Sequence, residues 1–241
     1  MFKTVLPLSA ILSLRFFGLF LVLPVLSAYA LQLQGATPTL IGVIVGGYAL
    51  TQAIFQVPFG VMSDKLGRKP TLLIGLIIFL VGSIICAVSQ DIYSLIFGRF
   101  LQGAGAIGAV IPAMISDLVN EESRGKAMAL MGGTIAISFA AAMGLGPVIA
   151  AYYGSISPLF WITAVLSILS MVILFTKVPN PPKIRHIYHS TTTTRDILKD
   201  KNLFNMIIIN GMQKGLMTVA FVLIPVLLTQ KTYGFNWEKV D

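Results

Sequence analysis

Asp64 and Arg68 lie four residues apart in a short charged loop, residues 60–69 (GVMSDKLGRK), between two long apolar runs. A carboxylate and a guanidinium at this spacing are about one helical turn apart and can form an ion pair. Asp117, at the end of a later apolar run, is a second candidate partner for Arg68. These residue types predict a charged cluster that ties segments together. The alternative is a basic turn with a surface ion pair that contributes little energy.

Two glycines and a proline shape this loop. Gly60 and Gly67 permit a tight reversal of the chain and a close approach of helices. Pro70 suits the first turn of the following helix, where its missing N–H costs nothing. Arg68 and Lys69 would face anionic lipid headgroups, an attraction of about 1 kcal/mol for each charge.

Arg15 and Arg99 each lie inside an apolar run. A guanidinium at the centre of a membrane helix costs about 2.5–3.5 kcal/mol on insertion scales, so it needs a cavity, carbonyl groups or a counter-charge. Arg99 stands about six residues from the start of its run, and its side chain could instead reach the outer interface. Gly103, followed by Gly105 and Gly108, would give this segment a smooth face for helix packing.

The elements that must position these residues follow from hydropathy. Hydrophobic residues make up 56% of the chain and charged residues 11%, and the mean hydropathy is +0.87, which is far from a soluble globular domain. Seven apolar runs reach the length of about 20 residues that crosses a bilayer. They are residues 5–30, 39–62, 71–88, 93–118, 127–153, 158–176 and 204–229. Because lipid offers no partner to an open backbone, we predict an all-α membrane protein.

Positive charge alternates between the connections. Lys and Arg occur before the first run and in the connections 63–70, 119–126 and 177–203, whereas 31–38, 89–92 and 154–157 have neither. The positive-inside rule then places the N-terminus and the basic connections in the cytoplasm. The net charge of +8 is a signal of this topology, and nothing in the sequence predicts a nucleic-acid partner.

The sequence divides into three parts. Residues 1–178 are predicted to form a six-helix bundle, 179–203 a polar cytoplasmic loop, and 204–241 a seventh transmembrane helix and the start of a second half. His186 and His189 in the loop have no Cys or carboxylate cluster beside them, and the single cysteine, Cys86, is interpreted as a packing residue. No metal site and no cofactor are predicted.

The charged loop resembles the signature loop between the second and third helices of major facilitator superfamily transporters, G-x-x-x-D-x-x-G-R-K. The resemblance implies the fold of that family, with a six-helix N-terminal bundle built from two inverted repeats. It also implies a conformational latch that holds the outward-open state and breaks as two halves rock. The latch residues are then Gly60, Asp64, Gly67, Arg68, Lys69 and Asp117.

Residues 99–105 resemble the fourth-helix pattern of the same family, R-x-x-x-G-x-G, whose arginine is linked to proton transfer. This resemblance assigns Arg99 and Gly103 to proton coupling or the cavity, and Arg15 in the first run is placed with them. Together with residues 14–24, 116–118 and 234–240, the pattern is most similar to the YajR-type branch of drug:proton antiporter-like transporters. The similarity runs through nearly all of this chain and covers about the first half of such a transporter.

Gly144, Gly146 and Pro147 in the fifth run would loosen and bend a membrane helix. They resemble the antiporter pattern G-x-x-x-G-P of drug:proton exchangers, shortened here to G-x-G-P. The resemblance favours export over uptake, and plain bending of the helix is the alternative.

The function implied by the resemblance is proton-coupled efflux of small molecules by alternating access, driven by the proton gradient, in the cell inner or plasma membrane. The alternative is a non-transporting membrane remnant or a scaffold subunit, which proton-driven efflux would distinguish. An enzyme is not predicted, because no nucleophile with a base appears in the runs. Cavity-facing aromatic residues would suit an amphiphilic compound, and the same residues would serve equally as packing: Phe16, Phe17, Phe20, Tyr48, Phe55 and Phe139.

Two departures from the family pattern limit these expectations. None of the apolar runs has a carboxylate in its middle, so the proton carrier is left open between Asp117 with Arg68 and a residue of a second half. The chain also covers only about one half of the family fold. We therefore expect it to be inactive alone, as a fragment of a full transporter or as half of an assembly with a second half or another copy.

Overall fold

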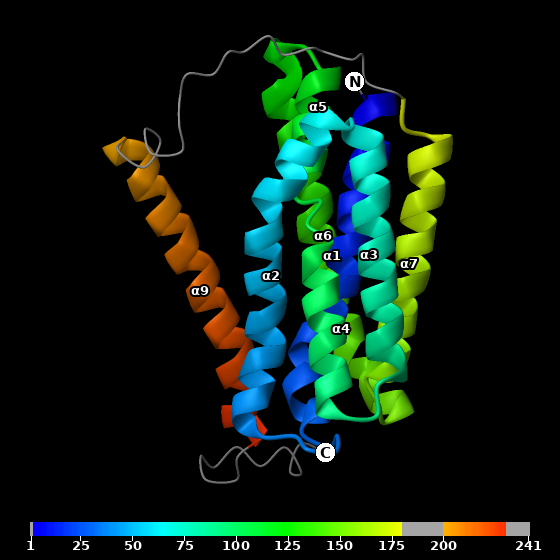
Figure 1. Cartoon of the computed structure of the whole chain (residues 1–241), viewed down its shortest axis with the longest axis vertical. Coiled ribbons are helices and arrows are strands. Elements are labelled where there is room, and N and C mark those ends of the chain that lie inside the picture. Colours follow the sequence, from blue (N-terminus) through cyan, green and yellow to red (C-terminus); the bar gives the residue numbers. More distant parts are fainter. Residues whose placement is uncertain (1, 180–199, 230–241) are drawn as a thin grey trace. The chain divides into compact units, whose positions relative to one another are not determined.

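The structure, a computed structural model, describes residues 2–179 and 200–229 (Figure 1). The described residues form the helices α1 (Phe2–Ala30), α2 (Pro38–Lys65), α3 (Arg68–Val88), α4 (Ile92–Ala104), α5 (Val110–Leu118), α6 (Glu121–Tyr153), α7 (Ser157–Thr176) and α9 (Lys201–Thr229). The helices α1 to α7 belong to one compact unit. A second unit contains α9, a 29-residue helix that covers the seventh predicted run.

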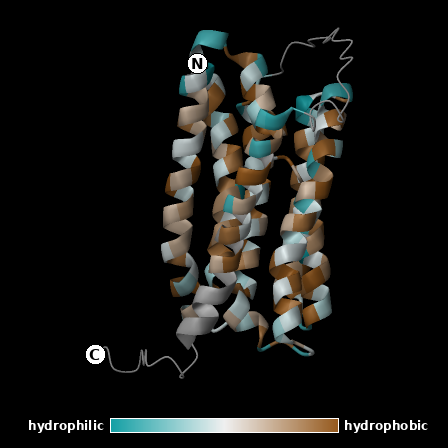
Figure 2. Ribbon diagram, turned by 90° about the vertical axis from the view of Figure 1, so that its left-hand side faces the viewer, coloured by the Kyte–Doolittle hydropathy of each residue, from teal (hydrophilic) through white to brown (hydrophobic). Residues whose placement is uncertain are grey.

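Five helices of the described residues, α1, α2, α3, α6 and α7, are long and apolar enough to cross a membrane. They coincide with the predicted runs 5–30, 39–62, 71–88, 127–153 and 158–176, so these predictions are confirmed. Large apolar side chains lie exposed on the outside of the bundle, where lipid would contact them. The ribbon is coloured hydrophobic over much of the length of these helices (Figure 2). Examples are Val57, Ile137, Val148, Val165 and Val172.

The prediction of one continuous helix over 93–118 is wrong, because the structure divides this span into α4 and α5. Between them Ala106 donates its N–H to the Ala104 carbonyl at 2.8 Å, and Ile107 donates to the Gly105 carbonyl at 2.9 Å. Gly105 approaches α3 so closely that an added Cβ would lie 3.2 Å from the backbone nitrogen of Phe79. The glycines that are predicted to form a packing face therefore also interrupt the helix, because glycine has the lowest helix propensity of the non-proline residues.

The packing of the first unit centres on α1 and α3. α1 packs against α6 and α7, α3 packs against α4 and α7, and α2 packs against α4. A large cluster of buried apolar side chains fills the space among α1, α3 and α5, and it includes Leu8, Leu76, Ile111 and Met114. This core fixes the ends of α2, α3 and α5, where the charged loop lies.

The basic connections gather at one end of this unit. The N-terminus of α1, the α2–α3 turn and the start of α6 lie together there, and hydrophilic residues colour the same end (Figure 2). At the other end two of the three connections without Lys or Arg contact each other, since Ile92 donates its N–H to the Gln34 carbonyl at 3.1 Å. The connections that alternate in positive charge along the sequence therefore lie at two opposite ends of one bundle.

Candidate functional site

Gly67 forms the turn that brings α3 back beside α2. Its φ of 101° and ψ of 159° lie where a residue with a side chain is strained. Leu66 closes α2 by donating its N–H to the Met62 carbonyl at 2.8 Å, and Thr71 Oγ1 donates to the Gly67 carbonyl at 2.9 Å. The predicted reversal at Gly67 is confirmed, and it makes Arg68 the first residue of α3.

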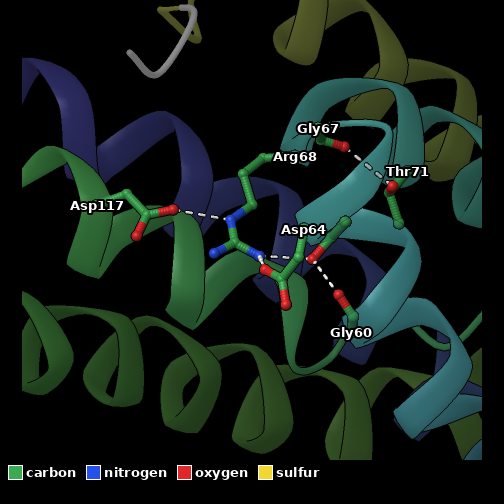
Figure 3. Close-up of polar contacts among 7 residues, drawn as sticks. Gly60, Asp64, Gly67, Arg68, Thr71 and Asp117 are labelled. Atoms are coloured by element: carbon green, nitrogen blue, oxygen red, sulfur yellow. Dashed lines mark hydrogen bonds and ion pairs between the residues drawn. The ribbon is translucent and has the colours of Figure 1, made fainter. Parts of the chain in front are cut away.

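Arg68 binds carboxylates from two other helices (Figure 3). Its Nη1 donates to Asp64 Oδ1 at 2.7 Å, near the end of α2, and its Nε donates to Asp117 Oδ2 at 2.8 Å, near the end of α5. Nη1 also donates to Ser63 Oγ at 2.5 Å, and this hydroxyl donates to the Gly60 carbonyl at 2.8 Å. We call the four side chains of Ser63, Asp64, Arg68 and Asp117 the Arg68 cluster.

The two carboxylates of the Arg68 cluster differ in burial. The side chains of Arg68 and Asp117 are 12% and 16% exposed, whereas that of Asp64 is 61% exposed. Sheltered hydrogen bonds to charged groups contribute about 1.5–3 kcal/mol each, and exposed ion pairs contribute about 0–1 kcal/mol. The contact with Asp117 is therefore the stronger tie, and Asp64 keeps most of its surface available.

Arg99 on α4 lies inside the bundle with 1% of its surface exposed. Its Nη1 donates to Gln102 Oε1 at 2.8 Å, and Gln102 Nε2 donates to Ser83 Oγ at 2.8 Å. The guanidinium carbon lies 4.7 Å from the centre of the Tyr48 ring, a favourable cation–π distance. The side chain therefore does not extend to the outer interface, and within the described residues its Nε and Nη2 have no hydrogen-bond partner.

Arg15 on α1 is also buried, with 4% of its surface exposed. Its guanidinium carbon lies 5.1 Å from the centre of the Phe79 ring, and its Nη2 has no hydrogen-bond partner among the described residues. Phe79 and Tyr48 pack together with Leu19 in one buried cluster, which we call the Tyr48–Phe79 cluster. The two arginines therefore border the same group of aromatic side chains.

The comparison with known proteins assigns this architecture to a family. Residues 8–240 match the model of the Major Facilitator Superfamily. The chain belongs to the Major Facilitator Superfamily. It is 49% identical over 173 residues to the inner membrane transport protein YajR of Escherichia coli K12, covering 72% of this chain and 38% of that protein. It is 40% identical over 227 residues to an uncharacterized transporter of Buchnera aphidicola, covering 92% of this chain and 58% of that one, and these relatives place it in the YajR branch.

More distant similarities agree with this assignment. A class E tetracycline resistance protein of Escherichia coli is 31% identical over 207 residues, covering 83% of this chain and 48% of that protein. The crystal structure of a D-xylose–proton symporter matches the fold with a TM-score of 0.65 at 18% identity, covering 95% of this chain and 62% of that one. The chain spans about half the length of the curated relatives it matches. The superfamily consists of integral membrane transporters rather than enzymes.

Two of the residues that resembled the superfamily signature, Gly60 and Lys69, contribute no side chain to the Arg68 cluster. Gly60 was predicted to shape the reversal, and this is wrong, because it lies inside α2, where an added Cβ would meet nothing within 4 Å. Lys69 is half-buried on α3 and has no ion pair within the described residues. Their role as latch residues stays a prediction.

The glycines of α4 and α6 mark close helix contacts. An added Cβ at Gly103 would collide with Thr51 and with the Tyr48 carbonyl of α2, so the predicted packing role is confirmed. One at Gly146 would collide with the Leu21 carbonyl of α1, whereas Gly144 faces open space. α6 runs from Glu121 to Tyr153 as one helix across Pro147, and the antiporter role of this segment stays a prediction.

Sequence reasoning missed the polar side chains that support the charged groups. Ser63 stands next to Asp64, and Gln102 lies one helical turn after Arg99, so a search for polar residues at helical spacing would have found both. No group of three His, Cys, Asp or Glu side chains that could hold a metal occurs among the described residues. His186, His189 and most of the loop 179–203 lie outside the described residues.

Proposed function

We propose that the chain forms the first half of a proton-coupled exporter of small molecules that works by alternating access. The observation that carries the proposal is the Arg68 cluster, in which one guanidinium binds carboxylates of α2 and α5 at 2.7 and 2.8 Å. It lies at the basic end of a bundle whose family consists of transporters. The proton gradient is the driving force in this proposal, and no cofactor is required.

In this proposal the Arg68 cluster is the conformational latch. Asp117 holds Arg68 inside the bundle, and the 61% exposed Asp64 remains available to a segment that packs on α2. Exchange of the Asp64 contact would require little energy, since exposed ion pairs contribute about 0–1 kcal/mol. The asymmetry between the two carboxylates thus suits a cluster with one permanent and one exchangeable partner.

The partner in this proposal is a second transporter half, or a second copy of the chain, together with lipid on the remaining faces. The surface of α2 beside Asp64 has a shallow hollow of about 570 Å³ with an almost wholly apolar lining. The lining residues are Val57, Pro58, Val61, Met62, Lys65 and Leu66. A helix packed there would cover apolar surface and reach the exposed carboxylate of Asp64.

We place the protein in the inner membrane, with the N-terminus in the cytoplasm. The inner-membrane context fits the relative YajR. The proposed orientation is supported by Lys65, Arg68 and Lys69 at the α2–α3 turn and by Arg124 and Lys126 at the start of α6, because positively charged connections are retained in the cytoplasm.

The substrate in this proposal is a small amphiphilic molecule. Half-buried aromatic side chains of α1 and α6, such as Phe20 and Phe139 with ring centres 4.8 Å apart, would contact its apolar part. Tetracycline is the first compound to test, because two relatives are tetracycline resistance proteins.

The test uses everted membrane vesicles that contain the complete protein. A proton gradient is imposed, and tetracycline accumulation is measured with and without a protonophore. We expect accumulation that the protonophore abolishes and that Asp117→Asn reduces about tenfold or more. Glu121→Gln is the matched control, because Glu121 is 87% exposed and its contact with Arg124 is long, at 3.6 Å.

Two outcomes would contradict the proposal. Accumulation that survives the protonophore would exclude proton coupling. No accumulation of tetracycline or of a panel of amphiphilic compounds, by protein that is correctly inserted, would favour a scaffold without transport.

A further inference from the structure

The free hydrogen-bond donors of Arg99 form one complete edge of its guanidinium group. Gln102 binds Nη1, and the Nε and Nη2 that remain are both buried and have no partner within the described residues. Nε–H and Nη2–H lie side by side on the planar group and match the two oxygens of a carboxylate. A single unpaired N–H could reflect packing alone, but a whole unpaired edge has the geometry of a ligand contact.

A second buried cation borders the same aromatic cluster as Arg99. Arg15 has an unpaired Nη2 and borders the Tyr48–Phe79 cluster from α1, while Arg99 borders it from α4. Within the described residues no acidic side chain forms an ion pair with either arginine, and Asp117, which lies at the end of the run 93–118, binds Arg68 instead. Both arginine charges are therefore left without a carboxylate partner among the described residues, and burying such a charge without a partner is costly.

The neighbours of α1 pack against it unevenly. α1 packs extensively on α6 and α7 but touches α2 in only a few places. Leu19 of α1 belongs to the Tyr48–Phe79 cluster, and Phe16 and Leu23 of the same helix pack against it. A ligand bound to the two guanidinium groups would therefore also contact apolar and aromatic side chains of α1.

We propose that Arg99 and Arg15 form a binding centre for the carboxylate group of a small organic anion with an apolar body. The Nε–Nη2 edge of Arg99 takes both carboxylate oxygens, Arg15 supplies the second positive charge, and the Tyr48–Phe79 cluster contacts the apolar part. This inference rests on the proposed transport function, for which it names the chemical class of the substrate. Gln102 acts as a positioning residue, because its bond to Nη1 directs the free edge of Arg99.

The test measures binding rather than transport. The complete protein in detergent is titrated with benzoate by isothermal titration calorimetry, and benzamide is the matched neutral ligand with the same ring. Arg99→Lys keeps the charge and removes the planar edge, and Arg15→Gln removes the second charge. Arg124→Gln is the control, because it removes a guanidinium that is 46% exposed at the protein surface.

We expect saturable binding of benzoate and no comparable binding of benzamide. Arg99→Lys should raise the dissociation constant about tenfold or more, because it replaces two parallel charge-assisted hydrogen bonds with a point charge. Arg15→Gln should also raise it, and Arg124→Gln should leave it unchanged. These comparisons use only variants that retain the monodisperse elution and thermal melt of the wild type, and the contrast between benzoate and benzamide needs only the wild-type protein.

Three results would overturn the inference: no saturable benzoate binding, equal binding of benzamide, or an unchanged constant in Arg99→Lys. The first result includes the case in which a carboxylate side chain from another part of the complete protein already fills the edge. The vesicle assay remains separate, so tetracycline transport without benzoate binding would refute the anion centre alone. Benzoate binding that depends on Arg99, without transport of any tested compound, would refute the exporter alone.

Discussion

Arg68 Nε and Asp117 Oδ2 lie 2.8 Å apart although the two residues are separated by 49 positions in the sequence. The second partner of Arg68, Asp64, is only one helical turn away across the α2–α3 turn. The contact with Asp117 therefore fixes tertiary structure, because it holds the start of α3 against the end of α5. The contact with Asp64 is local and exposed.

This difference predicts unequal effects of removing the two charges. Asp117→Asn should lower the free energy of unfolding by about 1.5–3 kcal/mol, because the guanidinium would lose its sheltered ionic partner. Asp64→Asn should lower it by at most about 1 kcal/mol. Denaturant unfolding of the purified protein followed by circular dichroism measures both. A larger loss in Asp64→Asn than in Asp117→Asn would contradict the assignment of the stronger tie.

Much of the fold could be predicted because membrane helices can be recognised in a sequence by their length and hydropathy. The runs that became α1, α2, α3, α6 and α7 needed only a count of apolar residues. The trio of Asp64, Arg68 and Asp117 was also predictable, because opposite charges at the same end of neighbouring spans attract one another. These inferences need only the local sequence and the side of the membrane on which each charged residue lies. No knowledge of helix packing is required.

The rest depends on contacts that no local pattern records. The break between α4 and α5 arises where Gly105 meets the backbone of α3, and glycines in a membrane helix more often mark packing without a break. From the sequence alone, the Arg99 guanidinium could contact a carbonyl group or a counter-charge, or it could face a cavity. Only the arrangement of α2, α3 and α4 shows that it is Gln102 and the face of Tyr48.

Gly67 and Gly60 offer a matched pair of substitutions in the charged loop. Gly67→Ala should destabilise the protein by about 1–2 kcal/mol, since its φ of 101° is unfavourable for any residue with a Cβ. Gly60→Ala should be neutral or slightly stabilising, because it lies inside α2 with open space around it and alanine favours helix. Thermal melts of the two variants measure the difference, and equal losses would show that the strained turn does not decide stability.

The Asp91 carboxylate at the start of α4 predicts a change of stability at acidic pH. The N–H of Ser94 binds it at 2.9 Å and the Ser94 hydroxyl at 2.8 Å, and with the N–H of Tyr93 they hold its pKa below the ordinary value of 3.8. A folded pKa below the unfolded value stabilises the fold at every pH above the unfolded value. The contribution is lost as the pH falls from about 3.8 through the lower folded pKa.

Asp91→Asn should therefore flatten the acidic arm of a plot of melting temperature against pH. Its melting temperature near neutral pH should change less, since asparagine is also a good N-cap. Ser94→Ala should flatten the acidic arm in part, because it removes one of the donors. An acidic arm with the wild-type slope in Asp91→Asn would show that other groups control this range.

Gly146 and Gly144 test whether the α6 glycines serve helix contact or helix bending. Gly146 faces the backbone of α1, where an added Cβ would lie 3.5 Å from Leu21 Cα and collide with the Leu21 carbonyl. Backbone cannot move aside as a flexible side chain can, so Gly146→Ala should force α1 and α6 apart at a cost of about 1–3 kcal/mol. Gly144→Ala meets nothing within 4 Å and should gain slightly from the better helix propensity of alanine.

The two alanine variants change the same residue type on the same helix, so helix propensity alone cannot separate them. If contact with α1 is the role of Gly146, its variant should melt at a lower temperature than the Gly144 variant, and transport should fall in step with the loss of folded protein. If bending at Pro147 is the role, both variants should retain the wild-type melt and both should lose transport, because either alanine stiffens the same turn. Opposite behaviour of the two glycines is the result that the close approach of α6 to Leu21 predicts.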